Sequence, residues 1–298
     1  MTRRVVVAGA GAWGQALAYV AESAGHDVSL WSRDRPVLPS CDVIILAVPA
    51  QAIRSVVLAL APALSTPLII SAKGIEQHSA KFLHEVIGES APLSPVLVLS
   101  GPSFAADVMR GLPTAVTLAA ASLAVASAWA AELTLANFRV YASDDVLGVE
   151  IGGALKNVLA IACGISDGRR LGDSARAALT TRGFAELMRF GKKLGARPET
   201  LTGLAGLGDL LLTCSSPQSR NYSFGFAVGA GKSVVEAIAS SRGVVEGVAT
   251  ARVAQALAKR YDVDMPIVAA VSAIIDEGSD PASEIARLLA RPVREEIR

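Results

Sequence analysis

The chain has 298 residues, of which 52% are hydrophobic but only 5% aromatic, and its formal net charge at pH 7 is +1. This length is sufficient for two domains with large buried cores. The near-zero charge argues against a general electrostatic attraction to nucleic acid or to an anionic membrane surface, so any acidic ligand has to be bound by local groups.

Short apolar runs alternate with helical patterns over the first half of the chain. Strands are predicted at residues 5–8, 28–31, 43–48, 68–71, 96–99 and 114–118, and helices at 13–24, 53–60, 82–87 and 104–109. The strand runs are continuously apolar, as expected for strands that are buried on both faces. The pattern predicts a Rossmann-like, doubly wound parallel sheet.

The residue pattern changes after Ser143. Helical periodicity dominates from there to the end of the chain, which predicts an all-helical second domain. We therefore expect a dinucleotide-binding domain at residues 1–143 and a helical substrate and catalytic domain at 144–298. Residues 112–131 carry no charge and are long enough to span a bilayer, but Pro113 and the hydroxyl side chains favour a strand and a helix. No membrane span is expected.

The cofactor signal is the sequence Gly9-Ala-Gly11-Ala-Trp-Gly14, which follows the first strand and opens the first helix. The glycines allow a tight turn, close approach to a pyrophosphate and close packing of helix on strand. Arg33 follows the second strand, where enzymes that prefer NAD usually carry an acidic residue, although Asp34 is available for a ribose hydroxyl. The pattern favours NADP(H), with NAD(H) as the alternative cofactor.

Three further motifs place polar groups where packing does not require them. Ser-Ala-Lys73-Gly and Ser-Gly101-Pro-Ser103 follow buried strands, at the edge where doubly wound sheets bind ligands. Lys156 and Asn157 lie within an otherwise apolar helix. A lysine there either extends to solvent or is desolvated, with a lowered pKa suited to proton exchange with a hydroxyl or carbonyl.

Together with Gly206-Leu-Gly-Asp209, Ser219-Arg-Asn and Val244-Val-Glu-Gly, these motifs occur in a fixed order along the chain. In that order they resemble the bacterial NAD(P)H-dependent glycerol-3-phosphate dehydrogenases, over nearly the whole chain. The resemblance implies interconversion of dihydroxyacetone phosphate and sn-glycerol 3-phosphate, which supplies glycerophospholipid synthesis. It also implies a homodimer.

Site residues follow from the same resemblance. The implied catalytic residues are Lys156, as proton donor and acceptor, Lys73 and Asp209. Cofactor contacts are implied for Gly9, Gly11, Ala12, Trp13, Gly14, Arg33, Lys73, Ala105, Arg220, Val244 and Glu246. Substrate contacts are implied for Lys73, Gly101, Ser103, Lys156, Asn157, Asp209, Ser219, Arg220 and Asn221. Arg220, with its planar fork of donors, suits a phosphate dianion.

No metal site is expected. The cysteines Cys41, Cys163 and Cys214 form no Cys-x-x-Cys pair, and this composition favours the reducing cytoplasm. His26, His78 and His84 are scattered, and we expect them to be ordinary surface or turn histidines.

The chain departs from the family between Asp34 and Cys41, where a longer stretch with a further short strand is absent. We expect the fold and cofactor binding to persist and closure over the substrate to suffer. Two alternatives remain: a related NADP-dependent hydroxy-acid dehydrogenase, or an NADP-binding protein that the missing segment has left catalytically impaired. The expected partner is a small phosphorylated substrate, and no nucleic acid is expected.

Overall fold

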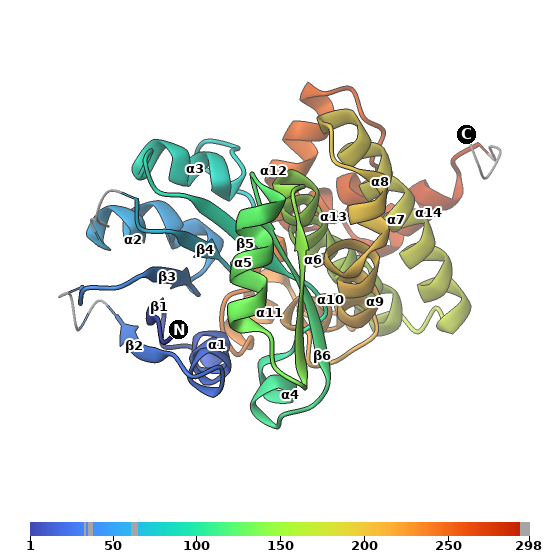
Figure 1. Cartoon of the computed structure of the whole chain (residues 1–298). Coiled ribbons are helices and arrows are strands. Elements are labelled where there is room, and N and C mark those ends of the chain that lie inside the picture. The colour runs from blue at the N-terminus through green and yellow to red at the C-terminus, as the bar shows by residue number, and fades with distance from the viewer. Residues whose placement is uncertain (33, 35–37, 61–64, 293–298) are drawn as a thin grey trace.

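The computed structural model describes residues 1–32, 34, 38–60 and 65–292. A seven-stranded sheet occupies the N-terminal half, with the strand order β2-β1-β3-β4-β5-β6-β7. Helices cover both faces of this sheet, and a purely helical half lies against one side of it (Figure 1). The predicted Rossmann-like sheet and helical second domain are therefore confirmed, with the last strand ending at Ser143.

The first five strands are parallel and lie where the apolar runs predicted them. They are β1 (Arg4–Ala8), β2 (Asp27–Trp31), β3 (Val43–Leu46), β4 (Leu68–Ile70) and β5 (Val96–Ser100). Alternate side chains of a strand point to opposite faces. Val5 and Val7 accordingly join the cluster under helices α1 (Ala12–Ser23) and α5 (Leu123–Leu133), whereas Val6 and Ala8 join the cluster under α2 (Ile53–Leu60) and α3 (Leu83–Ser90).

The far edge of the sheet departs from a purely parallel arrangement. Strand β6 (Thr114–Ala120) runs antiparallel to β5, and β7 (Phe138–Ser143) pairs with β6 in parallel. Strand β7 was not among the predicted strands. Its sequence mixes Arg139 and Tyr141 with apolar residues because it is an edge strand, and only Phe138 of its residues is buried. A continuous apolar run was therefore the wrong pattern to expect there.

At the opposite edge lies β2, which pairs with β1 alone among the described strands. Most of its residues are exposed or half-buried, and only Trp31 is buried. The connection to β3 passes through the shortened region between Asp34 and Cys41, of which residues 35–37 lie outside the described part. Strand β1, which carries the glycine-rich turn, is paired on both sides by β2 and β3.

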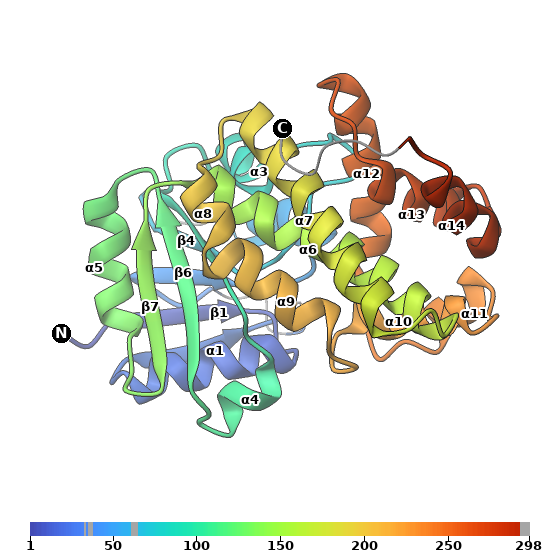
Figure 2. The same ribbon diagram turned by 90° about the vertical axis from the view of Figure 1, so that its right-hand side faces the viewer.

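The helical half is built around α6 (Val146–Gly168), whose residues 148–166 are all buried. Around it pack α7 (Asp173–Leu194), α8 (Pro198–Thr202), α9 (Asp209–Cys214), α10 (Arg220–Gly229), α11 (Val234–Ala239), α12 (Glu246–Arg260), α13 (Pro266–Asp276) and α14 (Pro281–Leu289) (Figure 2). By length and composition α6 could cross a membrane, but here it is the central helix of the packed half.

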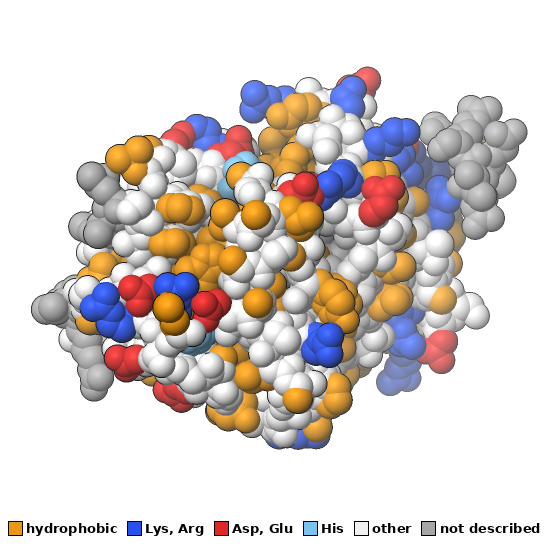
Figure 3. Space-filling model, viewed as in Figure 1, with side chains coloured by type: hydrophobic (Ala, Val, Ile, Leu, Met, Phe, Trp, Pro, Cys, Tyr) orange, Lys and Arg blue, Asp and Glu red, His pale blue; other side chains and the backbone are white. Residues whose placement is uncertain are grey.

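The surface reflects the balanced charge of the chain. Basic and acidic side chains are interspersed over the face shown in Figure 3, together with apolar ones. A surface of this kind lacks the field of a single sign that attracts a polyanion.

Candidate active site

The glycine-rich turn joins β1 to α1. Gly9 has a φ of +118°, and a Cβ there would lie 2.5 Å from the carbonyl oxygen of Ala47 on the next strand. A Cβ on Gly14 would lie 1.9 Å from the carbonyl oxygen of Gly9. Neither position therefore tolerates a side chain. Helix α1 begins at Ala12 without a side-chain cap, so its first amides face outward beside the exposed Gly11, as an anion site requires.

Lys73 and Gly101 meet at the ends of two neighbouring strands. Lys73 follows the end of β4, and its Nζ donates to the carbonyl oxygen of Gly101, which follows β5, at 2.9 Å. The hydroxyl of Ser103 donates to the same carbonyl oxygen at 3.1 Å. Gly101 has a φ of +147°, and a Cβ there would come within 2.8 Å of Val116 Cα. The loop after β5 is therefore held tightly against β6.

A single carboxylate joins the two predicted lysines. Asp209 Oδ2 accepts from Lys73 Nζ at 2.7 Å, and its Oδ1 accepts from Lys156 Nζ at 2.5 Å. Lys73 comes from the sheet half, whereas Lys156 lies on α6 and Asp209 begins α9. Asp209 is 1% exposed and Lys156 is 7% exposed. The structure thus brings together the three residues to which the sequence assigned catalysis.

Thr213 completes this cluster and was missed at the sequence level. Its hydroxyl accepts from Lys156 Nζ at 3.0 Å and donates to the carbonyl oxygen of Asp209 at 2.6 Å. Thr213 lies one turn after Asp209 on α9, a spacing that puts both on one side of a helix. Only this spacing from Asp209 could have indicated Thr213 in the sequence, and many threonines have a similar spacing.

Burial controls the electrostatics of the cluster. Removal from water is the main cause that lowers the pKa of Lys156; the charge of Asp209 opposes this shift and the charge of Lys73 adds to it, so that the pKa is about 7. Burial of the Asp209 carboxyl acts to raise its pKa, but the two ammonium groups outweigh this and the pKa is lowered. Asp209 therefore stays ionised, and Lys156 can gain or lose a proton near neutral pH.

The approach of α9 to α6 depends on Gly152. Residues Leu204–Gly208 form a single π-helical turn, η2, directly before Asp209. A Cβ on Gly152 would lie 2.5 Å from the carbonyl oxygen of Ala205 in that turn. Only glycine lets α6 pass this close to the backbone, and the close passage puts the Asp209 carboxylate beside Lys156. Irregular helical turns of this kind often occur at functional sites.

Two asparagines connect the Lys73–Asp209–Lys156 cluster to the start of α12. Asn157 Nδ2 donates to the carbonyl oxygen of Lys73 at 3.0 Å, and its Oδ1 accepts from Asn221 Nδ2 at 2.8 Å. Asn221 Oδ1 in turn accepts from the backbone nitrogen of Gly247 at 2.9 Å. Both were predicted to contact substrate, and the structure places them in one network that starts at Lys73.

The remaining predicted residues surround the start of α10 and α12. Ser219 Oγ caps α10 by accepting from Tyr222 N at 3.2 Å, so this hydroxyl already has a structural partner. Arg220 is the first residue of α10, and its Nη1 lies close to Gly243, where a Cβ would be 3.1 Å away. Val244 is exposed, and it lies two residues before Glu246.

Glu246 has one satisfied and one unsatisfied oxygen. Its Oε1 accepts from Ala50 N at 3.1 Å, which joins α12 to the short 3-10 helix Ala50–Ala52 between β3 and α2, whereas its Oε2 is shielded from solvent and has no partner among the described residues. Burial raises the pKa of Glu246. A buried acceptor without a donor is costly, so the site fits a ligand that supplies one.

Other sequence-level expectations have mixed outcomes. Trp13 and Ala105 are half-buried, at the starts of α1 and of α4 (Ala105–Met109). Arg33 lies outside the described residues. The expectation of surface or turn histidines is wrong for His26, which is 8% exposed with its Nε2 2.9 Å from the carbonyl oxygen of Glu132, because it packs between β2 and α5. The described residues include no group of three or more potential metal ligands, and their cysteines are free.

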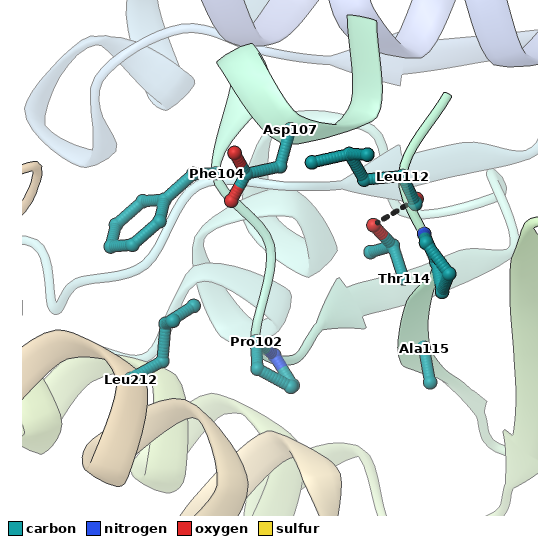
Figure 4. A pocket seen from close by; sticks show the side chains of 8 residues that line it. Pro102, Phe104, Asp107, Leu112, Thr114, Ala115 and Leu212 are labelled. Carbon is teal, nitrogen blue, oxygen red and sulfur yellow. Dashed lines mark hydrogen bonds between the residues drawn. The ribbon is translucent and has the colours of Figure 1, made fainter. Parts of the chain in front are cut away.

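A cavity of about 470 Å³ lies beside the loop after β5. Pro102 and Phe104 of that loop line it together with Asp107 of α4, Leu212 of α9 and residues 112–115 at the start of β6 (Figure 4). The described lining does not include the two lysines or Asp209. The cavity is therefore a neighbour of the polar cluster, separated from it by the loop that carries Gly101 and Ser103.

Comparison with known proteins decides the family. Residues 4–40 and 35–126 match the N-terminal model of NAD-dependent glycerol-3-phosphate dehydrogenase, and residues 145–286 match its C-terminal model. The chain belongs to this family. Glycerol-3-phosphate dehydrogenase (NAD(P)+) of Parvibaculum lavamentivorans is 46% identical over 327 residues, covering 99% of this chain and 98% of that protein. The enzyme of the same name from Azorhizobium caulinodans is 50% identical over 326 residues, covering 98% of both chains.

A solved structure supports the same assignment. The crystal structure of glycerol-3-phosphate dehydrogenase from Coxiella burnetii is 37% identical in sequence, with a TM-score of 0.90, and the match covers 97% of this chain and 99% of that one. Both halves of the fold, and therefore the cleft between them, belong to one known architecture. These comparisons favour the glycerol-3-phosphate dehydrogenase interpretation over the hydroxy-acid alternative.

Proposed function

We propose that this protein is an NAD(P)+-dependent glycerol-3-phosphate dehydrogenase that interconverts dihydroxyacetone phosphate and sn-glycerol 3-phosphate. The observation that carries the proposal is the buried Lys73–Asp209–Lys156 cluster, in which one carboxylate joins a lysine from each half of the molecule. A structural role does not explain a buried and a half-buried ammonium group around one buried carboxylate, because such a cluster costs more desolvation than apolar packing would.

Lys156 is the proposed acid and base. The nicotinamide cofactor supplies or accepts the hydride when it is bound. During reduction of the ketone, the Lys156 ammonium donates its proton to the developing alkoxide, and during oxidation the neutral amine removes the hydroxyl proton. Asp209 orients this ammonium, and Thr213 holds it from a second side. Lys73 adds positive charge near the reacting oxygen, where negative charge develops.

The described residues fit a dinucleotide. The open N-terminus of α1 and the glycine-rich turn suit the pyrophosphate, while the orphan Oε2 of Glu246 can accept from a donor of the ligand. We expect NADP(H) to bind more tightly than NAD(H), since Arg33 follows β2 at the position that meets a 2′-phosphate. Titration of the purified protein with both cofactors tests this, and equal dissociation constants would refute the preference.

Arg220 is the proposed ligand of the substrate phosphate. It is exposed at the start of α10 beside Gly243, where the partly positive helix N-terminus adds to its charge. Arg220→Lys keeps the charge but loses the bidentate fork. We expect a higher Michaelis constant for dihydroxyacetone phosphate, by about tenfold for one lost charge-assisted hydrogen bond, and little change with unphosphorylated dihydroxyacetone. An equal loss on both substrates would place Arg220 away from the phosphate.

The decisive experiment is oxidation of NADPH on addition of dihydroxyacetone phosphate. Activity with this substrate but not with keto acids supports the proposal, whereas the reverse supports a hydroxy-acid dehydrogenase. Binding of NADPH without turnover of either substrate supports the impaired binding protein. Each outcome selects one of the three interpretations.

We further propose that the protein is a cytoplasmic homodimer that supplies glycerol phosphate for glycerophospholipid synthesis. We also propose that each chain is divided into domains 1–143 and 144–298. The end of β7 at Ser143 and the start of α6 at Val146 support this division. The 327-residue alignment with the Parvibaculum enzyme exceeds the 298 residues of this chain, which supports the proposed loss of a segment between Asp34 and Cys41. Light scattering on the purified protein tests the dimer, and fractionation of cells tests the compartment.

A further inference from the structure

The segment that carries Lys73 continues into the core of the helical half. Residues 73–84 lead from the loop after β4 into the first turn of α3, and an isolated antiparallel bridge joins Ile75 to Phe82. Both side chains are buried, 0% and 5% exposed, and they belong to the same hydrophobic cluster as Ile151 and Leu155 of α6. Residues 75 and 82 of the sheet half therefore pack into the hydrophobic core of the helical half.

Two polar contacts attach the segment to α6, one at each end. At the first end, Asn157 Nδ2 donates to the Lys73 carbonyl oxygen at 3.0 Å. At the other end, Glu150 Oε1 accepts from His84 N at 2.9 Å, and Glu150 Oε2 contacts His84 Nδ1. Glu150 and Asn157 are two helical turns apart on α6, so they lie on one side of it about 10 Å apart along its axis.

The contact between Glu150 and His84 involves a buried carboxyl group. Glu150 is 5% exposed, and burial raises the pKa of its carboxyl although His84 opposes the shift. For His84, burial acts to lower the pKa, but the hydrogen bond and charge of Glu150 outweigh it and the pKa is raised. In addition, Glu150 satisfies a free backbone N–H in the first turn of α3, so it caps that helix from across the domain boundary.

A single contact would let the segment pivot on α6, whereas two contacts fix its position. Resting on the function proposed above, we propose that Glu150 and His84 are positioning residues of the reaction, which hold Lys73 at its place opposite Lys156 and Asp209. Neither residue is within the cluster itself. The effect of Glu150 and His84 reaches the cluster by two routes. Residues 73–84 begin with Lys73, and α6 carries Lys156 as well as Glu150.

His84 offers the sharper test, since its side chain is about one-third exposed and its replacement leaves Glu150 the backbone contact. His84→Leu removes the ring donor while keeping bulk. His84→Asn places an amide nitrogen near the position of Nδ1 and restores a donor. His78→Leu is the matched control, because His78 is an exposed histidine on the same segment. For each protein, kcat, the Michaelis constants, the NADPH dissociation constant and the unfolding temperature are measured.

We expect His84→Leu to lower kcat about tenfold, on the scale of couplings through packed networks, with NADPH binding close to wild type. The unfolding temperature should fall, because the buried Glu150 Oε2 loses its ring donor, so kcat is measured where the variant is fully folded. His84→Asn should recover most of the loss, and His78→Leu should behave as wild type. A wild-type kcat in His84→Leu would overturn the positioning role. So would an equal loss in His84→Asn, or a loss that follows the fraction of unfolded protein. Failure of the wild type to reduce dihydroxyacetone phosphate would instead overturn the proposed function itself.

Discussion

Lys156 shows how one residue acquires its chemistry from its surroundings. A lysine in an apolar helix usually extends its ammonium to solvent. On α6 this is prevented, because neighbouring elements bury the helix on all sides. The ammonium is stabilised instead by Asp209 and Thr213. Its lowered pKa is the consequence of burial, and the ability to exchange a proton follows from that pKa.

The first prediction concerns this ammonium. Lys156→Met keeps the apolar stem and removes the exchangeable proton. We expect kcat to fall by at least about 10²-fold, the lower bound for loss of general acid–base help, while NADPH binding and the folded state persist. Steady-state kinetics and cofactor titration measure both quantities. Lys192→Met, on the exposed side of α7, is the control, and near-normal turnover in Lys156→Met would end the assignment.

The second prediction concerns pH. The pKa of Lys156 is lowered to about 7, so the protonated form needed to reduce the ketone is lost as the pH rises through about 7. The neutral form needed for oxidation accumulates over the same interval. Rates of the chemical step in the two directions should therefore change in opposite senses around pH 7, as single-turnover measurements can show. Parallel profiles in both directions would contradict Lys156 as the titrating group.

At the scale of elements, the contact of α6 with η2 determines where Asp209 lies. Helix α9 begins directly after η2, so a displacement of Ala205 is passed to the Asp209 carboxylate. Gly152 permits the contact because it has no Cβ to meet the Ala205 carbonyl oxygen. Gly152 of the Gly-Gly-Ala-Leu-Lys motif thus acts on Lys156 indirectly, because it allows Asp209 to lie beside the lysine.

The third prediction follows from this contact. Gly152→Ala should destabilise the fold by about 1–3 kcal/mol, as overpacking does, and should lower kcat because α9 and Asp209 are pushed away from Lys156. Chemical denaturation and kinetics measure the two effects. Gly88→Ala is the matched control, since a Cβ there meets nothing within 4 Å and alanine favours the helix. A fully active, stable Gly152→Ala protein would show that η2 is not held by this approach.

Elements differ in how well the sequence predicted them. The buried parallel strands and their helices were predicted because each has a continuous or periodic apolar pattern. Strand β7 was missed because this edge strand alternates core-facing and exposed positions at its start instead of forming a continuous apolar run. Phe138, Val140 and Ala142 pack against the core. The π-helical turn η2 was missed as well, because its glycines indicate only that the chain turns and comes close to another segment.

At the scale of the whole molecule, the proposed loss between Asp34 and Cys41 follows the edge strand β2. Strand β1, which carries the glycine-rich turn, keeps neighbours on both sides, and the Lys73–Asp209–Lys156 cluster lies on the opposite side of β3 from β2. The glycine-rich turn and the lysine cluster are therefore separate from this connection, whereas Arg33 directly precedes it. The substrate-facing cover of the cleft is the part that a missing loop would affect.

The fourth prediction tests this separation. Grafting the longer segment of the Azorhizobium relative between Asp34 and Cys41 should lower the Michaelis constant for dihydroxyacetone phosphate, because a longer loop can exclude water and orient the substrate. The set of essential residues should stay the same. A glycine- and serine-rich insertion of equal length is the control. If the natural protein binds NADPH but neither it nor the graft turns over substrate, the impaired binding protein is the better interpretation.

By itself, the sequence indicated the doubly wound sheet and the helical second half, and through its family resemblance it pointed to the two lysines and Asp209 as candidate catalytic residues. It could do so because apolar periodicity and the order of short motifs are local properties of the chain. Only the tertiary structure decided that Asp209 joins both lysines, that Thr213 completes the cluster and that Glu150 reaches His84. These contacts join residues 53, 136, 57 and 66 positions apart. No local pattern encodes such distances, since they result from how α6, α9 and the strand ends pack together.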